Sequence, residues 1–134
     1  MTMTALLVED NALNRLLFSE VLTHAGFGVI TDPTGADAIA MARRHHPRVA
    51  LIDLGLPAVS GLDLIRRLRA TPMTRSIPVI AVSAFARTED GLAALNAGAD
   101  LFFCKPVDTT RLAAALLSLT EESSDTGLEA GSAA

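Results

Sequence analysis

Charged and polar residues follow four apolar segments of this 134-residue chain, at the point where each segment ends. They are Glu9, Asp10, Asp53, Ser83 and Lys105. Each has an ordinary explanation when taken alone, as a solvated turn, a capping residue or a surface charge. If the segments are parallel strands of one sheet, their carboxyl ends lie along one edge, where open α/β sheets bind ligands. It is improbable that all of these groups meet at one edge by accident, so together they indicate a common site.

Three carboxylates and one ammonium group at such an edge indicate a particular chemistry. Carboxylates that lie close together repel, so at neutral pH they require a cation or raised pKa values. No His or Cys accompanies them, which disfavours zinc, whereas an all-oxygen set of few ligands suits magnesium shared with a phosphate. A carboxylate can itself act as a nucleophile and form an aspartyl phosphate, with a metal ion neutralising the phosphoryl oxygens. Lys105 would pair with another phosphoryl oxygen, and Ser83 would donate a hydrogen bond to a third.

The segment 49–53 is the element around which the others are organised. Its apolar residues have the length and branching of a parallel strand that is buried on both faces. Asp53 ends this run, and Gly55 and Pro57 stop the strand just beyond it. We therefore expect Asp53 at the rim of the sheet rather than inside it.

Strand and helix patterns alternate five times along the chain. Strands are predicted at residues 5–8, 28–31, 49–53, 79–82 and 101–104. Helices are predicted from Leu13 to near Gly26, at residues 36–46, 60–70 and 89–97, and after Asp108, which caps the last one. This alternation predicts a doubly wound α/β fold, with a parallel sheet covered on both faces.

Two local patterns support the predicted helices. Capping boxes are predicted at Thr34 with Asp37 and at Ser60 with Asp63. Apolar residues recur at helical spacing at Leu13, Leu16, Leu17 and Val21 in the first helix, and Leu62, Ile65 and Leu68 are expected to face inward in the third.

Composition limits the possible class of protein. The length indicates one domain, residues 1–120, and the Glu, Ser, Gly, Thr and Ala of residues 121–134 predict a disordered tail. No apolar run approaches a membrane span, and no export signal is evident. The net charge of −4 argues against a nucleic-acid surface, and the single cysteine, Cys104, fits a reducing cytoplasm.

The motifs together resemble the CheY-like receiver domain of two-component response regulators, over about residues 3–120. They are V-E-D-N at 8–11, D-L-G-L-P at 53–57 with Gly61, V-S-A at 82–84, and K-P at 105–106. The V-E-D-N-x-x-N and S-A-F-A segments are most similar to stand-alone receivers of the DivK type and to receivers of hybrid kinases. The resemblance implies a (βα)5 flavodoxin-like fold with strand order 2-1-3-4-5.

The resemblance also implies a role for each site residue. Asp53 would be the phosphoacceptor, with Lys105 as its basic partner and Ser83 as the hydroxyl that contacts the phosphoryl group. Mg2+ would be bound by Asp10 and Asp53, by the backbone carbonyl of Gly55, and by Glu9 through a water. The Lys105–Pro106 bond would be cis. Phe102 would take the aromatic switch position, where many relatives carry Tyr.

The function implied is that of a single-domain response regulator in a phosphorelay. It would accept a phosphoryl group from a phosphohistidine of a sensor histidine kinase or a histidine phosphotransfer protein. It would then signal to a protein target through the fourth helix, fifth strand and last helix, and catalyse only its own phosphorylation and dephosphorylation. A cytoplasmic monomer or weak homodimer is expected, with no nucleic-acid or membrane partner. Met1 and the predicted tail favour a complete stand-alone protein.

Four alternatives stay open at this point. The chain could be a receiver taken from a hybrid histidine kinase or a larger regulator, or a degenerate receiver that binds partners without phosphate. It could be a magnesium-dependent phosphatase with an Asp nucleophile, although Gly55 stands where such enzymes need a second carboxylate. A flavin or nucleotide binder would need a phosphate loop after the first strand, where Glu9 and Asp10 would repel a phosphate without metal.

Overall fold

The structure is a computed structural model that describes residues 3–84 and 87–132, with side chains described as far as residue 120. Within these ranges five strands alternate with five helices. The strands are β1 (Met3–Val8), β2 (Phe27–Asp32), β3 (Val49–Asp53), β4 (Val79–Ser83) and β5 (Leu101–Cys104). The helices are α1 (Ala12–His24), α2 (Ala38–His45), α3 (Gly61–Ala70), α4 (Thr88–Ala97) and α5 (Thr109–Ser132).

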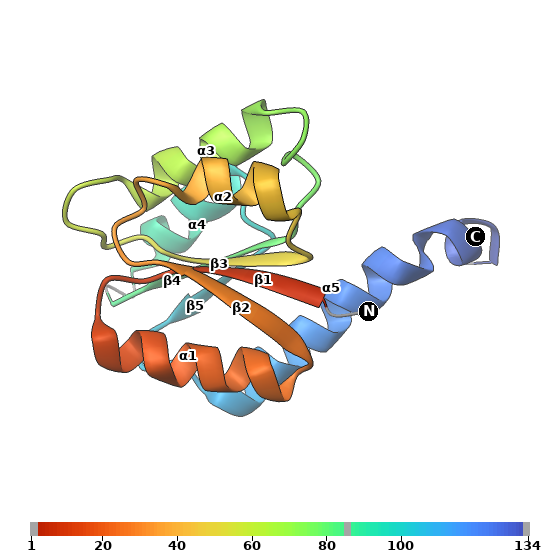
Figure 1. The fold of residues 1–134 in the computed structure, drawn as a ribbon, viewed down its shortest axis with the longest axis horizontal. Helices are drawn as coiled ribbons and strands as arrows, with labels where there is room; N and C mark the ends of the chain where they lie inside the picture. The colour runs from red at the N-terminus through yellow and green to blue at the C-terminus, as the bar shows by residue number, and fades with distance from the viewer. Residues whose placement is uncertain (1–2, 85–86, 133–134) are drawn as a thin grey trace.

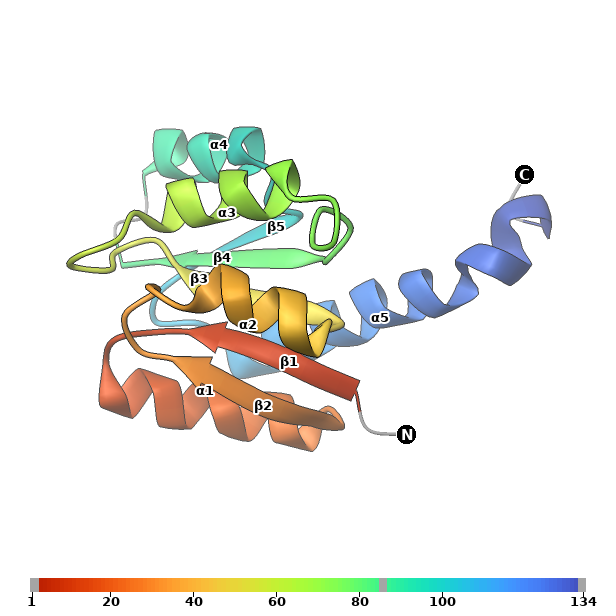
Figure 2. The ribbon, with the colours of Figure 1, turned by 45° about the horizontal axis from the view of Figure 1, so that its top comes forward.

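The strands form one parallel sheet in the order β2-β1-β3-β4-β5, which confirms the predicted flavodoxin-like topology (Figure 2). Helices α2, α3 and α4 cover one face, and α1 and α5 cover the other (Figure 1). Each face has its own apolar core, one containing Leu64, Ile65 and Leu68 of α3, the other containing Phe18 and Leu22 of α1. Every residue of β3 is buried, as expected of a central strand with helices on both sides.

Helix α1 forms where the sequence predicts a helix, but it buries a different set of side chains. Its buried residues are Phe18 and Leu22, one turn apart on the stripe that faces the sheet. The predicted apolar positions Leu13, Leu16 and Leu17 are 74%, 63% and 43% exposed. Their helical spacing is real, but these three leucines face solvent, whereas Val21, the fourth predicted position, is partly buried against the core of this face.

The two predicted capping boxes have different outcomes. Ser60 caps α3, because its Oγ accepts a hydrogen bond from the Asp63 amide at 3.2 Å. The prediction at Thr34 and Asp37 is wrong, since α2 begins at Ala38 and the Asp37 side chain makes no capping bond. The buried carboxylate of Asp32 orders this segment instead, accepting hydrogen bonds from the amides of Thr34 at 3.2 Å and Asp37 at 2.9 Å.

Asp108 caps α5 as predicted, with its Oδ1 accepting from the amides of Thr110 at 2.9 Å and Arg111 at 3.1 Å. The helix continues to Ser132 and extends away from the sheet (Figure 1). It therefore includes the backbone of residues 121–132 of the segment predicted to be a disordered tail, whose last two residues lie outside the described part of the chain. The domain boundary at residue 120 stays a prediction. Within the described residues, no helix has the length and apolar character that crossing a membrane requires.

Candidate functional site

The parallel register brings the carboxyl ends of β1, β3, β4 and β5 to one edge of the sheet. Asp53 lies opposite Val82, and Ser83 lies opposite Cys104. Two backbone hydrogen bonds continue this register beyond the strands, from the Leu54 amide to the Val82 carbonyl and from the Lys105 amide to the Ser83 carbonyl, both at 2.8 Å. Leu54 and Lys105 therefore continue the hydrogen-bond pattern of the sheet beyond β3 and β5.

Glu9, Asp10 and Asp53 form a carboxylate cluster at this edge. One oxygen atom of each lies within 4.8 Å of the others. The Glu9 side chain is 1% exposed, Asp53 is buried and Asp10 is exposed, so the cluster opens to solvent on one side. Glu9 Oε2 accepts from the Asn11 amide at 3.1 Å, and Asp53 Oδ1 accepts from the Gly55 amide at 2.9 Å. Both buried carboxylates are thus oriented by the loops that carry them.

Lys105 reaches this cluster from the end of β5. Its Nζ lies 3.1 Å from Asp53 Oδ2 and 3.1 Å from Glu9 Oε1. The Lys105–Pro106 peptide bond is cis, as the resemblance implied. Burial alone would lower the pKa of Lys105, but its hydrogen bonds to Asp53 and Glu9 outweigh that effect and raise it. The side chain is an ammonium ion at neutral pH, ready to pair with an anion.

One ammonium group does not balance three carboxylates, and Glu9 shows the imbalance. Its pKa is raised above the ordinary value, chiefly by burial and also by the charge of Asp53, against the opposing effects of the Asn11 amide and Lys105. Glu9 Oε1 is buried without a well-formed hydrogen bond among the described residues, although the ammonium group is 3.1 Å away. Clustered hard oxygen donors with surplus negative charge fit a divalent cation such as Mg2+.

Gly61 allows the third helix to begin directly against the acceptor strand. A Cβ atom at this position would lie 2.6 Å from the Asp53 carbonyl oxygen and 2.7 Å from Leu54 Cα. Both are backbone atoms that cannot move without displacing Asp53. Only glycine fits here, because α3 packs against the backbone that presents the Asp53 carboxylate.

Ser83 and Gly55 line a cavity of about 210 Å³ between the β3–α3 loop and α4. Arg87 and Asp90 line it on the α4 side. Phe102 does not line this cavity, and its partly buried ring packs instead beside Gly91 of α4. The structure therefore gathers the predicted acceptor, metal and lysine positions in one cluster, with Ser83 and Gly55 beside it and Phe102 farther away.

Comparison with known proteins agrees with this geometry. The response regulator receiver domain family matches residues 5–117. The chain belongs to this family. It is 39% identical over 111 residues to the polar-differentiation response regulator DivK of Brucella ovis, which covers 83% of this chain and 90% of that protein.

Solved structures show the same fold. A CheY-like receiver domain protein from Methanospirillum hungatei superposes with a TM-score of 0.82 at 24% identity, covering 91% of this receiver and 96% of that chain. The receiver domain of a sensor histidine kinase from Pseudomonas aeruginosa has a TM-score of 0.82 at 30% identity, covering 90% of this receiver and 99% of that chain. That second structure holds a magnesium ion in its active-site cleft.

Sequence reasoning missed one residue that contacts the receiver's acidic loop. Nη1 of Arg15 donates hydrogen bonds to the carbonyl oxygens of Glu9 at 3.0 Å and Asp10 at 3.2 Å. A signal for it exists in the sequence. Arg15 falls near the start of a predicted helix, where the helix dipole disfavours a cation, so a specific partner for its charge is expected there.

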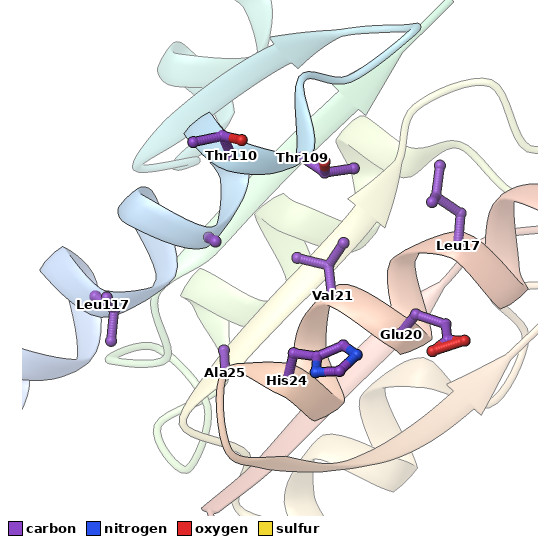
Figure 3. A pocket seen from close by; sticks show the side chains of 9 residues that line it. Leu17, Glu20, Val21, His24, Ala25, Thr109, Thr110 and Leu117 are labelled. Carbon is purple, nitrogen blue, oxygen red and sulfur yellow. The ribbon is translucent and has the colours of Figure 1, made fainter.

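A groove of about 530 Å³ lies between α1 and α5 on the same face of the receiver as the exposed leucines of α1. Leu17 and Val21 of α1 face Thr109 and Leu117 of α5 across it (Figure 3). Because α1 starts two residues after Asp10, its first exposed leucine, Leu13, lies within one turn of the acidic loop. The acceptor edge is thus flanked by an apolar surface.

Proposed function

We propose that this receiver is a single-domain response regulator of the DivK type, which accepts a phosphoryl group on Asp53 in a magnesium-dependent reaction. The observation that carries the proposal is the setting of the Asp53 carboxylate. It is buried at the end of the central strand, 3.1 Å from an ammonium group and within 4.8 Å of two further carboxylates. The relatives support the same function, because this chain covers 90% of the length of the Brucella response regulator.

The transfer requires little covalent chemistry from the protein. An Asp53 carboxylate oxygen attacks the phosphorus atom of a phosphohistidine, the P–N bond breaks, and the imidazole nitrogen keeps the bonding electron pair. Attack by water on the phosphorus atom later cleaves the aspartyl phosphate, which releases inorganic phosphate and returns the carboxylate. Asp53 Oδ1 is held by the Gly55 amide at 2.9 Å, so Oδ2, which faces Lys105, is the oxygen we assign as nucleophile.

The other site residues would stabilise the charge of the transferred group. Asp10, Asp53 and the Gly55 carbonyl would bind Mg2+, and Glu9 would hold a metal-bound water. The ion would neutralise phosphoryl oxygens during transfer. Lys105 would pair with one phosphoryl oxygen in place of one of its carboxylate contacts. The Ser83 hydroxyl would donate a hydrogen bond to a second phosphoryl oxygen.

Two surfaces would connect the acceptor with partner proteins in the cytoplasm. The exposed leucines of α1 and the groove between α1 and α5 adjoin the acidic loop, so we assign them to the phosphohistidine donor, a sensor kinase or a histidine phosphotransfer protein. The surface of α4, β5 and α5, which includes Phe102, would contact the downstream target. A monomer or weak homodimer would leave both surfaces accessible.

The test is incubation of the full chain with Mg2+ and either acetyl phosphate or phosphoramidate, whose P–N bond imitates phosphohistidine, followed by intact mass measurement. We expect one added phosphoryl group in the wild type and none in Asp53→Asn. Asp63→Asn removes an exposed carboxylate that pairs with Arg66, and it should be labelled like the wild type. Equal labelling of Asp53→Asn would overturn the assignment of the acceptor, and absence of labelling in the wild type would overturn the function.

A further inference from the structure

Arg15 contacts the acidic loop from the first part of α1. The helix starts at Ala12 and is capped by Asn11, whose Oδ1 accepts a hydrogen bond from the Asn14 amide at 2.8 Å. The Arg15 amide donates to the Asn11 carbonyl at 2.8 Å, which anchors the residue in the helix. Its half-buried side chain then turns back toward the preceding loop, where Nη1 donates to the carbonyls of Glu9 and Asp10.

Stability of the helix does not explain this arrangement. A guanidinium group near the N-terminus of a helix is opposed by the partial positive charge of the unpaired amides there. The cap is already provided by Asn11, so Arg15 adds nothing to it. The hydrogen bonds of Arg15 therefore serve the loop before the helix.

The two carbonyls that Arg15 binds have a specific relation to Asp10. The Glu9 carbonyl belongs to the peptide group that precedes the Asp10 Cα, and the Asp10 carbonyl belongs to the one that follows it. Fixing both groups fixes the backbone dihedral angles of Asp10 and thus the direction of its Cα–Cβ bond. Within the described residues, no hydrogen bond or ion pair holds the Asp10 carboxylate itself, so its placement depends on its backbone.

We infer that Arg15 is a positioning residue for the divalent cation: by holding both peptide groups of Asp10, it orients this carboxylate toward those of Glu9 and Asp53. The inference rests on the proposed magnesium-dependent function. Residues that orient metal ligands commonly change metal affinity severalfold or more.

The charge of Arg15 has the opposite effect on metal binding, which makes the inference testable. A guanidinium group near the cluster repels a divalent cation, so its removal would tighten Mg2+ binding if charge were its main influence. If positioning dominates, the same removal weakens Mg2+ binding. The two accounts predict changes of opposite sign.

The experiment is a titration of the full chain with Mg2+ alone, followed by the amide NMR signals of Asp10, Asn11 and Gly55. We expect Arg15→Ala to weaken Mg2+ binding by about tenfold and to speed amide hydrogen exchange at Asn11 before metal is added. Arg15→Lys keeps the charge and one donor group, and it should show an intermediate affinity. Arg44→Ala, which removes an exposed arginine of α2, is the matched control and should bind Mg2+ like the wild type.

Tighter or unchanged Mg2+ binding by Arg15→Ala would overturn the inference. Should that variant fail to fold, Arg15→Met, which keeps the length of the side chain but has neither donor nor charge, decides the matter: wild-type or tighter affinity would again contradict positioning. A wild type that binds no Mg2+ and accepts no phosphoryl group would overturn the proposed function first. A wild type that does both, beside an Arg15→Ala variant equal to it, would overturn only the role of Arg15.

Discussion

Two charged clusters lie at opposite ends of β4 and β5, and they are built in different ways. The first, called the Arg69 cluster, lies at the amino ends of these strands. Nε of Arg69 donates to the Gly98 carbonyl at 2.9 Å, and its Nη1 donates to the carbonyls of Arg75 at 2.9 Å and Ile77 at 2.6 Å. Nη2 pairs with Asp100 at 3.0 Å, and the same carboxylate oxygen accepts from the Val79 amide at 2.8 Å. In the Lys105 cluster, at the carboxyl ends, one ammonium group faces Glu9, Asp10 and Asp53.

The two clusters differ in how completely their charges are balanced. Arg69 has one carboxylate partner, and its remaining hydrogen bonds go to backbone carbonyls of loops that it joins. Lys105 has a surplus of carboxylates around it, and an oxygen of Glu9 is left poorly satisfied. A closed set of partners stabilises a fold, whereas surplus charge at an accessible edge provides a place for a ligand. The following variants test this distinction.

Removal of Arg69 should have the largest effect on stability. Arg69→Met leaves three backbone carbonyls and Asp100 without their donor, so we expect a loss of about 3 kcal/mol in the free energy of unfolding. Urea denaturation measures this loss, and Mg2+ should not restore it. Arg67→Met, at an exposed position of the same helix, is the control and should change stability little. An equal loss in both variants would contradict the structural role of the Arg69 cluster.

Removal of Lys105 should cost less, and a metal ion should offset it. Lys105→Met leaves the carboxylates without their cation, and we expect a loss of about 1–2 kcal/mol, because Asp10 is exposed and water reaches the cluster. Mg2+ should recover much of this stability, since it supplies positive charge at the same place. A response to Mg2+ that is equal in Lys105→Met and Arg69→Met would remove the distinction between the clusters.

The sequence predicts the Lys105 cluster but not the Arg69 cluster, and the reason is physical. Asp53 and Ser83 end their strands, and Glu9 and Lys105 directly follow theirs. Parallel topology brings strand ends together whatever the details of packing. Most partners of Arg69 are backbone carbonyls of loops, and every residue type has a backbone carbonyl. No pattern of side chains could therefore predict them.

Helix α1 shows a second limit of sequence reasoning. Helical spacing predicts that Leu13, Leu16 and Leu17 lie on a helix, but the side of the helix that meets the sheet depends on tertiary packing. Phe18 and Leu22 occupy that side. Similarly, Asp32 rather than Thr34 and Asp37 orders the start of α2, because its carboxylate ends a strand and accepts from two amides of the following loop.

Glu9 gives the Lys105 cluster a dependence on pH. Its pKa is raised above the ordinary value of 4.5, mainly by burial, so the folded state holds this proton more tightly than the unfolded state does. The contribution of Glu9 to the free energy of unfolding therefore falls as the pH rises from 4.5 to the raised pKa of the folded state. Glu9→Gln should remove this slope and increase stability at neutral pH when no Mg2+ is present.

The measurement is thermal unfolding without metal across the acidic range. The difference between Glu9→Gln and the wild type should shrink as pH falls to 4.5, where the wild-type residue becomes neutral in the unfolded state as well. Glu20→Gln removes an exposed carboxylate of α1, and it should leave the slope as in the wild type. A Glu9→Gln variant that is less stable than the wild type at neutral pH would show that pairing with Lys105 outweighs burial.

The smallest effect is expected between the two clusters, on β5. This strand begins just after Asp100 and ends just before Lys105, with the ring of Phe102 between them. A Cβ atom added at Gly91 of α4 would lie 3.2 Å from Cδ2 and 3.5 Å from Cε2 of this ring. In Gly91→Ala, the gain of about 1 kcal/mol from replacing glycine inside a helix is opposed by displacement of the ring. We expect a net change in stability well below that gain.

The double variant Gly91→Ala with Phe102→Leu separates these two contributions. Leucine lacks the ring edge that meets the new methyl group, so the helical gain should appear when the double variant is compared with Phe102→Leu alone. The ring signals of Phe102 should shift in Gly91→Ala. They should also respond less to Mg2+ with beryllofluoride, because the added methyl group fills part of the space in which the ring packs beside residue 91. If the ring keeps its wild-type environment and the full helical gain appears in the single variant, Gly91 does not set the position of Phe102. The contact between Gly91 and Phe102, which lies on β5 between the Arg69 cluster and the Lys105 cluster, would then be an ordinary core contact.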